Sequence, residues 1–556
     1  MMFWKQLMIT IVVCLCGIAE AGVYEVGPNR VRTQIGEVPW ESLAAGDTVQ
    51  IHWRPEPYRE KWVICRTGTA DRKIVVRGVP NAQGALPVVD GRDATTRSVL
   101  NYWNEKRGVI KVGGANVPAD TMPRHIVIEN LEIRSGRPPY TFSGRDGLTA
   151  YAKNSAAIFV EKGEHITVRN CVLRDCGNGL FCASQSSDVL VEGCHIFDNG
   201  IEGRIYEHNN YTEARGIVFQ YNHFGALREG CLGNNLKDRS AGTVIRYNWI
   251  ENGNRQLDLV DSDHSELIQD PAYRSTFVYG NVLVEADGEG NNQICHYGGD
   301  SGDLSRYRKG TLYFYNNTVV STRSGSTTLL RLSSEEETCD LRNNILYVTA
   351  PGERLALMNA AGRLLLRNNW IKAGWVKAHG FLTGEVQDLG GNLTGDHPGV
   401  QDVGAQRFGP TDDSPCVDGG TDLAPGGVAN PVSREYVPHR QGRPRLKRGN
   451  PDIGAYEYVP VQTDFDGSGR VDFADFIMFA SAFGRRSQDV NWDARYDLDG
   501  NAEIGFSDFV LFVQTFGREA SGVSVESHRI LRLYDERIEV CFGSRIGDAK
   551  DWGFVF

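Results

Sequence analysis

Short apolar runs alternate with polar turns along residues 126–375, and the same phrase recurs many times. A typical unit runs from Val244 to Ile250, with an apolar pair, a polar stretch that ends in Asn248 and a second apolar pair. Runs this short between turn residues are typical of strands rather than helices. The phrases follow one another at intervals of 23 to 40 residues. Their turn positions are Asn130, Asn170, Gly193, Asn222, Asn248, Asn281, Asn317, Asn344 and Asn369.

Such a unit cannot bury its apolar face alone, but stacked units can. We interpret each unit as two short strands hinged at an Asn, which tolerates left-handed backbone geometry and whose amide can bond its copy in the next coil. The pattern predicts an all-β fold, a parallel β-helix, with insertions that build a groove on one side. A propeller of antiparallel blades is the alternative, but its blades need about 40–50 residues each.

The predicted β-helix domain covers residues 22–459. Residues 22–125 form its opening coils, with apolar stretches at 46–51, 74–78 and 88–91. The regular coils are 126–375, and residues 376–459 form a closing segment.

Residues 1–21 have the pattern of a secretory signal peptide. Lys5 precedes an apolar run from Leu7 to Cys16, and small residues at 19 and 21 predict cleavage before Gly22. No later stretch approaches the roughly 20 apolar residues of a membrane helix. We therefore expect a secreted protein, extracellular or attached to a cell surface, without a membrane span.

The net charge of −11 disfavours nucleic acid as a partner, because nucleic-acid binding requires a basic surface. An acidic polysaccharide would have to be bound by a local basic patch.

Residues 460–517 change in character and contain two similar loops, each followed by an amphipathic stretch. Oxygen-bearing side chains occupy the positions of a twelve-residue calcium loop, with Gly469 at its sixth position. The second loop has Ala502 at that position and Gly505 where an oxygen ligand is expected, so we predict weaker binding there. The predicted calcium ligands are Asp464, Asp466, Ser468, Asp472 and Asp475 in the first loop, and Asp497, Asp499, Asn501 and Asp508 in the second.

These features resemble two known families. The Asn-bearing coils of residues 23–459 resemble right-handed parallel β-helix enzymes, which include pectate, alginate and chondroitin lyases and polygalacturonases. The duplicated loop and helix of residues 463–517 resemble a type I dockerin, which implies calcium binding and attachment to a cohesin module of a scaffold or surface protein. Residues 518–556 form a tail without an assignable motif.

Lys237 and Arg239 are the first candidates for catalysis. If Leu236 points inward, alternation along the strand sends both cations to the outer face. The stretch 236–240 is similar to the lysine-bearing turn of alginate and chondroitin lyases. That resemblance implies Lys237 as the base that removes a proton beside a uronate carboxyl group, with calcium or a second cation to neutralise that group. Residues 230–233, however, lack the acidic calcium ligands of those lyases.

A protonated lysine is a poor base, so the lyase hypothesis needs nearby cations that favour the neutral amine. Arg246 and Arg255 are candidates for this role and for binding substrate. Long insertions add His208 as a second-rank catalytic candidate and Tyr211, Glu213 and His296 as substrate-binding candidates, because loops of this kind concentrate functional residues.

Two other functions remain open. Asp258 and Asp261 lie in one short run after Lys237, and paired carboxylates in a groove are what a glycoside hydrolase needs. The shaft could also bind glycans without cleaving them, as an adhesive protein does. The sequence therefore predicts β-elimination of an acidic, uronate-containing glycan, with hydrolysis or simple binding as alternatives.

Overall fold

The computed structural model describes residues 21–518, apart from 289, 439, 446–448, 459–462 and 499–501, and two further strands at 529–534 and 537–542. The predicted signal peptide lies outside the described residues, except for Ala21. Within the described part of the chain, no helix is long and apolar enough to cross a membrane.

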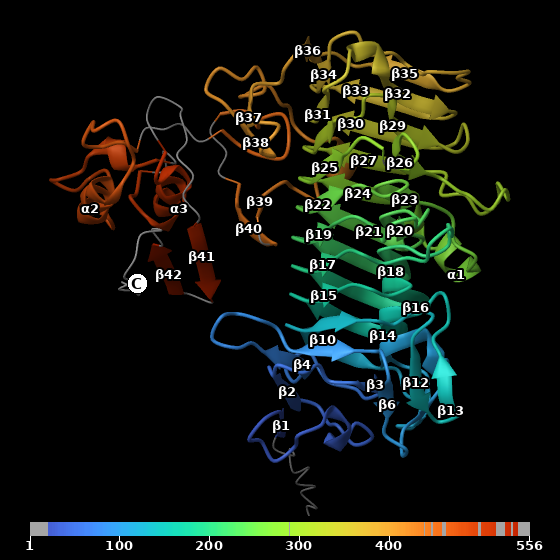
Figure 1. Ribbon diagram of the computed structural model, residues 1–556. Helices are drawn as coiled ribbons and strands as arrows, with labels where there is room; N and C mark the ends of the chain where they lie inside the picture. Colours follow the sequence, from blue (N-terminus) through green and yellow to red (C-terminus); the bar gives the residue numbers. More distant parts are fainter. Residues whose placement is uncertain are drawn as a thin grey trace, which may run out of the picture.

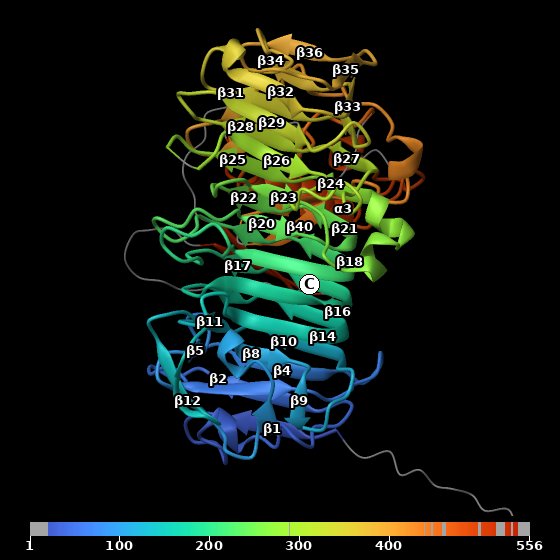
Figure 2. The same ribbon diagram turned by 90° about the vertical axis from the view of Figure 1, so that its right-hand side faces the viewer.

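The chain from β1 to β36 winds into a stack of coils, and each regular coil contains three strands (Figures 1 and 2). One coil consists of β20 (Leu236–Asp238), β21 (Ala241–Arg246) and β22 (Trp249–Glu251). Each strand pairs in parallel with its equivalent in the next coil. This confirms the predicted all-β parallel β-helix and corrects the expected coil of two strands. The recurring phrase covers only the second and third strands of each coil.

The three strands of a coil form three faces of the stack. The first-face strands are β3 (Glu60–Ile64), β8 (Gly108–Val112), β14 (Ala156–Arg169), β16 (Asn178–Glu192), β18 (Asn210–Gln220), β20, β23 (Leu257–Leu259), β26 (Gln293–Tyr297), β29 (Thr327–Leu332) and β32 (Leu355–Ala360). The second face begins with β1 (Val23–Val26), β2 (Thr48–His52), β4 (Ile74–Val79) and β10 (Arg124–Glu129). It continues through β14, β16 and β18 into β21, β24 (Ser275–Tyr279), β27 (Thr311–Tyr315), β30 (Thr338–Arg342), β33 (Arg363–Arg367) and β35 (Glu385–Asp388).

The third face is a separate sheet of short strands. They are β5 (Val88–Asp90), β11 (Glu132–Arg134), β15 (Val172–Leu173), β17 (His195–Ile196), β19 (His223–Phe224), β22, β25 (Val282–Glu285), β28 (Thr318–Ser321), β31 (Ile345–Val348), β34 (Trp370–Lys372) and β36 (Leu393–Gly395).

A row of buried asparagines joins the second and third faces. The backbone N–H and side-chain amide of Asn248 both donate to Oδ1 of Asn281, at 2.9 and 3.0 Å, and Asn281 bonds Asn317 in the same way. This confirms the predicted amide ladder. The left-handed backbone lies one residue earlier in these coils, at Tyr247 and Gly280. The complete ladder is Asn222, Asn248, Asn281, Asn317, Asn344, Asn369 and Asn392.

The interior is filled by inward-facing side chains that repeat from coil to coil. On the first face, Leu236, Leu257, Cys295, Leu330 and Met358 are aligned and fully buried. Burial of such an apolar column is the main source of stability in a stacked solenoid.

The closing segment adds one more coil and then runs back along the side of the stack (Figure 1). Tyr315 donates its hydroxyl proton to Asn430 O (2.7 Å), and Tyr247 donates to Pro431 O (3.2 Å). The segment thus covers tyrosines of the second face. It contains the antiparallel pairs β37 (Val400–Asp402) with β38 (Arg407–Pro410) and β39 (Arg434–Val437) with β40 (Gln441–Pro444).

Residues 463–518 form a small helical unit. Helices α2 (Phe473–Ala482) and α3 (Phe506–Thr515) pack through aromatic rings, with Phe479 stacked on Phe512 at 5.4 Å. Strands β41 (Arg529–Tyr534) and β42 (Arg537–Phe542) form an antiparallel pair in the C-terminal tail.

Candidate functional site

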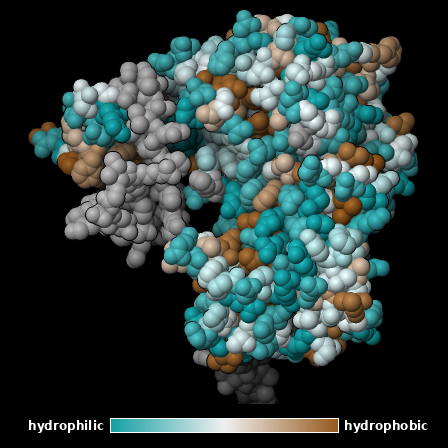
Figure 3. Space-filling view, viewed as in Figure 1, coloured by the Kyte–Doolittle hydropathy of each residue, from teal (hydrophilic) through white to brown (hydrophobic). Residues whose placement is uncertain are grey.

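Outward-facing residues of the first face form a continuous row, because the strands keep their register from coil to coil. We call this the first-face row; Figure 2 shows its strands β20, β23, β26 and β29 one above another. The row runs through Phe159, Phe181, Tyr211, Lys237, Asp258, His296 and Arg331. It changes from aromatic to charged side chains near its middle. The exterior is largely hydrophilic on the side of the molecule shown in Figure 3.

Lys237 lies between two carboxylates. Its Nζ is 2.5 Å from Asp258 Oδ2, which belongs to the next strand, and 2.7 Å from Asp300 Oδ2, which comes from the insertion after β26. Lys237 is 6% exposed and Asp258 2%, whereas the Asp300 side chain is 33% exposed. An amino group engaged in two ion pairs suits electrostatic support better than proton abstraction.

Arg239 joins the same network, as the predicted alternation requires. Its Nη2 donates to Asp300 Oδ1 at 2.9 Å, and its Nη1 donates to the carbonyl of Asp261. The Asp261 carboxylate is fully buried and accepts the backbone N–H of Asp300 at 2.7 Å. Asp261 therefore positions the turn that carries Asp300 and does not face substrate.

Asp258 is ionised despite its burial. Burial alone raises its pKa, but Lys237 and a hydrogen bond from His296 outweigh that effect and hold the pKa well below the ordinary value. His296 Nδ1 lies 2.9 Å from Asp258 Oδ1, and its Nε2 lies 2.9 Å from Ser333 Oγ. We call Lys237, Arg239, Asp258, His296 and Asp300 the charged cluster.

His208 and Tyr211 lie beside this cluster. Burial, with the charge of Lys237, lowers the pKa of His208 to about 3, so the ring is neutral. His208 Nδ1 accepts the backbone N–H of Asn234 at 2.9 Å, which leaves the ring proton on Nε2. The ring of Tyr211 is stacked on Phe181 at 5.2 Å, and the Arg239 guanidinium lies 5.7 Å from its centre.

The pKa values of Glu213 and Asp300 are shifted in opposite directions. Burial raises the pKa of Glu213, although Ser262 Oγ donates to Glu213 Oε1 at 2.5 Å. Burial also acts on Asp300, but Lys237 and Arg239 overcome it and lower the pKa. One short segment holds both carboxyl groups, since Asp261 binds the backbone of Asp300 and Ser262 binds Glu213.

The structure places the two predicted substrate-binding arginines, Arg255 and Arg246, on different faces. Arg255 Nε donates to Gln293 Oε1 at 3.0 Å, and its charge acts on Asp258 and Asp300, so it belongs to the site. Arg246 lies on the second face, where it bonds Gln220 at 2.8 Å and the Tyr279 hydroxyl at 3.2 Å. The prediction that Arg246 binds substrate with the other residues is not supported, because the chain bends between β20 and β21.

The sequence prediction missed Asp300, which binds both candidate cations. It lies in the turn 298–302, rich in Gly, directly after β26, and no recurring phrase marks this position. In the sequence, Asp300 is marked only as an acidic residue that follows shortly after the candidate His296, at the end of a first-face strand.

The first calcium loop brings three predicted ligands together. Asp464, Asp466 and Asp475 offer carboxylate oxygens within 4.8 Å of one another. The backbone N–H of Ser468 donates to Asp464 and Asp466, whereas Asp472 accepts from Ala474 N at 2.8 Å and caps α2. Carboxylate oxygens are the donors that calcium prefers.

The second loop is only partly described, since Asp499 and Asn501 lie outside the described residues. Asp508 accepts the backbone N–H groups of Leu498 and Gly505, at 2.5 and 2.7 Å. Ala502 has φ of 69°, a left-handed conformation that costs energy for a residue with a Cβ. The calcium predicted in the β-helix remains a prediction, and among the described residues no group of three His, Cys, Asp or Glu side chains meets there.

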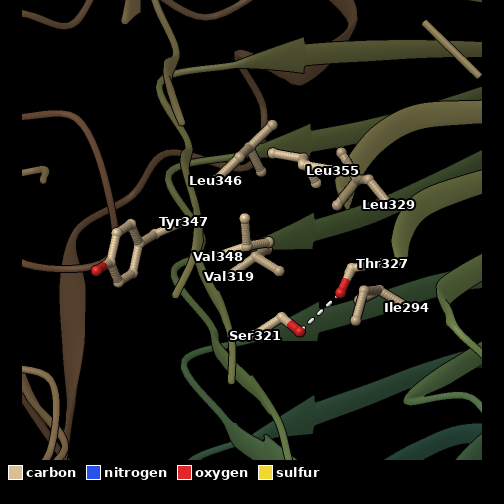
Figure 4. Close-up of a pocket in the computed structure, with 9 residues that line it drawn as sticks. All are labelled: Ile294, Val319, Ser321, Thr327, Leu329, Leu346, Tyr347, Val348 and Leu355. Carbon is tan, nitrogen blue, oxygen red and sulfur yellow. Dashed lines mark hydrogen bonds between the residues drawn. The ribbon is translucent and has the colours of Figure 1, made fainter. Parts of the chain in front are cut away.

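A small hollow inside the stack is lined by none of the charged-cluster residues (Figure 4). Its lining is mostly apolar, and Ser321 and Thr327 bond each other across it at 2.7 Å. It is a packing defect of the core, because its polar groups already satisfy one another.

The match to a family model agrees with the β-helix. Residues 102–270 match the family model described as right handed beta helix region. No curated protein matches the chain. An alginate lyase from Paenibacillus sp. str. FPU-7 is 12% identical over 63% of this chain and 94% of its own, with a TM-score of 0.36. A lacto-N-biosidase from Eubacterium ramulus is 11% identical over 68% of each chain, with a TM-score of 0.38.

Proposed function

We propose that the protein hydrolyses a polysaccharide bound along the first-face row. The observation that carries this proposal is the pair of carboxyl groups, Glu213 and Asp300, held by residues 261–263. Burial raises the pKa of Glu213 and so favours its protonated form, whereas Lys237 and Arg239 lower the pKa of Asp300 and favour its ionised form. Two carboxyl groups with opposed acidity are the arrangement by which glycosidases separate acid and base roles.

In this mechanism Glu213 donates a proton to the leaving glycosidic oxygen. Asp300 faces the sugar ring as the nucleophile, or as the base that activates water, and Arg239 holds its orientation at 2.9 Å. Lys237 and Asp258 neutralise each other beneath it and provide a fixed electrostatic environment.

The test is an assay of released reducing ends on a panel of neutral and acidic polysaccharides, with absorbance recorded for unsaturated uronate. Hydrolysis gives new reducing ends without the absorbance of unsaturated uronate. New ends with absorbance would establish the lyase that the lysine-bearing turn predicts, and retention on the polymer without new ends would establish a binder.

Variants identify the two carboxyl groups. Glu213→Gln and Asp300→Asn should each lower turnover by about 10²–10⁴-fold, the usual range for a lost acid or base, with the melting temperature nearly unchanged. Asp303→Asn is the matched control, because Asp303 is an exposed carboxylate in the same insertion, paired with Arg306. Equal activity of all three variants would disprove the assignment.

We also propose that residues 463–517 bind calcium and tether the secreted enzyme to a cohesin module. The converging carboxylates of Asp464, Asp466 and Asp475 support the first part. Calcium should raise the melting temperature of this unit and leave the β-helix transition in place, because the ion binds only the folded loop. Asp464→Ala should reduce that shift more than Asp497→Ala, and a single calcium-independent transition would contradict the proposal.

A further inference from the structure

Two arginines beside the charged cluster, Arg255 and Arg331, form no ion pair with any described residue. Arg331 follows His296 on the first-face row, and its buried Nε has no hydrogen-bond partner. Arg331 forms no ion pair with any described residue. Among the same residues, the side chain of Arg255 forms a hydrogen bond only with the side-chain amide of Gln293. By contrast, Arg342 on the second face is paired with Asp340.

Both arginines lie beside β26. Gln293, the partner of Arg255, lies on that strand, and Arg331 extends from the next strand, β29. Burial lowers the pKa of Arg255, and although Asp258 opposes this change, the positive charge of Arg331 adds to it. Asp258 and Asp300 act on Arg255 through space but form no ion pair with it, and Arg331 has a buried N–H without a partner. Neither guanidinium is therefore matched by a carboxylate of its own among the described residues.

We propose that Arg255 and Arg331 form a subsite for an anionic substituent of the glycan, a carboxylate or a sulfate ester. The planar guanidinium presents paired N–H donors that match such groups. Arg331 extends from β29, the strand that follows β26 in the stack, whereas Glu213 lies on β18 and Asp300 directly after β26. The anionic sugar therefore lies on the C-terminal side of the sugar that is cleaved. This inference uses the proposed function only to identify the ligand as a glycan.

Equilibrium binding tests the subsite without cleavage, in proteins that all carry Asp300→Asn. The probes are polygalacturonate and the same polymer with its carboxyl groups reduced to alcohols, and chondroitin sulfate with its desulfated form. The background protein, which carries only Asp300→Asn, should bind at least one anionic polymer more tightly than the same polymer without its carboxyl or sulfate groups. The two polymer pairs distinguish a carboxylate from a sulfate.

Arg331→Gln and Arg255→Gln should each weaken binding of the anionic polymer by about tenfold or more at low salt. Neither should change binding of the polymer from which that group has been removed. Arg367→Gln is the control, because Arg367 is an exposed arginine at the end of the second face and loses the same charge.

The inference is overturned if Arg331→Gln binds every anionic polymer as the background does, or if the background does not distinguish the members of either pair. Failure of the proposed function looks different. In that case wild-type protein releases no new ends, but the arginine variants still lose affinity for the anionic polymer.

Discussion

The asparagine ladder and the first-face row are two lines of residues along the same stack, and they differ in every respect that matters for function. The ladder repeats one residue in seven coils, and each amide bonds its neighbours in the ladder. The first-face row places a different residue in each coil, from Phe181 through Lys237 to Arg331. Repetition indicates a structural position, and departure from repetition indicates the site.

The physical reason is satisfaction of polar groups. Asn281 forms its hydrogen bonds within the ladder and with buried carbonyls, so every additional coil is stabilised by the same residue. Lys237 is satisfied by two carboxylates of different origin, and only in this coil. This network depends on one neighbouring strand and one insertion, so it cannot be propagated along the stack.

The largest effect should come from Lys237→Met. This change leaves Asp258 as a buried charge without its main partner, which typically costs about 3–5 kcal/mol. The free energy of unfolding in denaturant should fall by that amount, and activity should be lost. The double variant Lys237→Met with Asp258→Asn should recover most of the stability without recovering activity. If the single variant is as stable as wild type, the ion pair contributes nothing to stability, and the contrast drawn between the first-face row and the ladder is wrong.

Asn281→Ala breaks the ladder instead. It removes an acceptor from Asn248 and a donor from Ile245 O, all of them buried, and should lower the free energy of unfolding by about 3 kcal/mol. Turnover per folded molecule should remain at the wild-type value, because the ladder lies between the second and third faces. Asn154→Ala, at an exposed asparagine, is the control and should change neither quantity. A loss of turnover in the Asn281 variant would show that the two rows are coupled.

The sequence allowed prediction of what repeats. The β-helix, its regular coils and the amide ladder followed from a phrase that recurs with Asn at its turn. The first-face strand was not recognised as a third strand of each coil, because β20, β23 and β26 share apolar inward residues but no outward pattern. A strand of three residues such as Leu236–Asp238 is also too short to show alternation by itself.

The candidate site was predicted in part for the same reason. Alternation placed Lys237 and Arg239 on one side correctly, since it depends only on local geometry. Asp300 was missed because its contact with Lys237 spans 63 residues and depends on the path of an insertion. Arg246 was grouped with the site because it is close in sequence, but the bend after Asp238 turns it to another face.

Acidity distinguishes the two rows further, because the ladder contains no titratable group. The folded pKa of His208, about 3, lies below the ordinary value of 6.5, so between these values the unfolded chain binds a proton that the folded chain does not. The stabilising contribution of neutral His208 is complete above pH 6.5 and decreases as the pH falls. At pH 5 the loss should be about 2 kcal/mol.

His208→Asn keeps an acceptor for the Asn234 N–H and removes the titration. Its unfolding free energy should therefore fall about 2 kcal/mol less than that of wild type between pH 7 and pH 5 in denaturant titrations. Asn281→Ala should keep the wild-type pH dependence. Parallel curves for wild type and the His208 variant would mean that His208 is protonated in the folded protein.

The smallest effect is expected from Arg246→Ala, and it tests whether position on a face or proximity in sequence determines function. Arg246 and Arg239 are both arginines of one coil, separated by the bend between β20 and β21. Arg246 bonds Gln220 and Tyr279 beside the returning C-terminal segment, so its loss should change kcat/KM less than about twofold and stability by about 1 kcal/mol. Arg239→Ala releases Asp300 from its guanidinium and should lower kcat/KM by at least about tenfold, the usual cost of a hydrogen bond between charged groups. The measurement is kcat/KM of the two variants on the same substrate. Comparable losses would place the glycan across both faces, whereas a loss confined to the Arg239 variant places it on the first face alone.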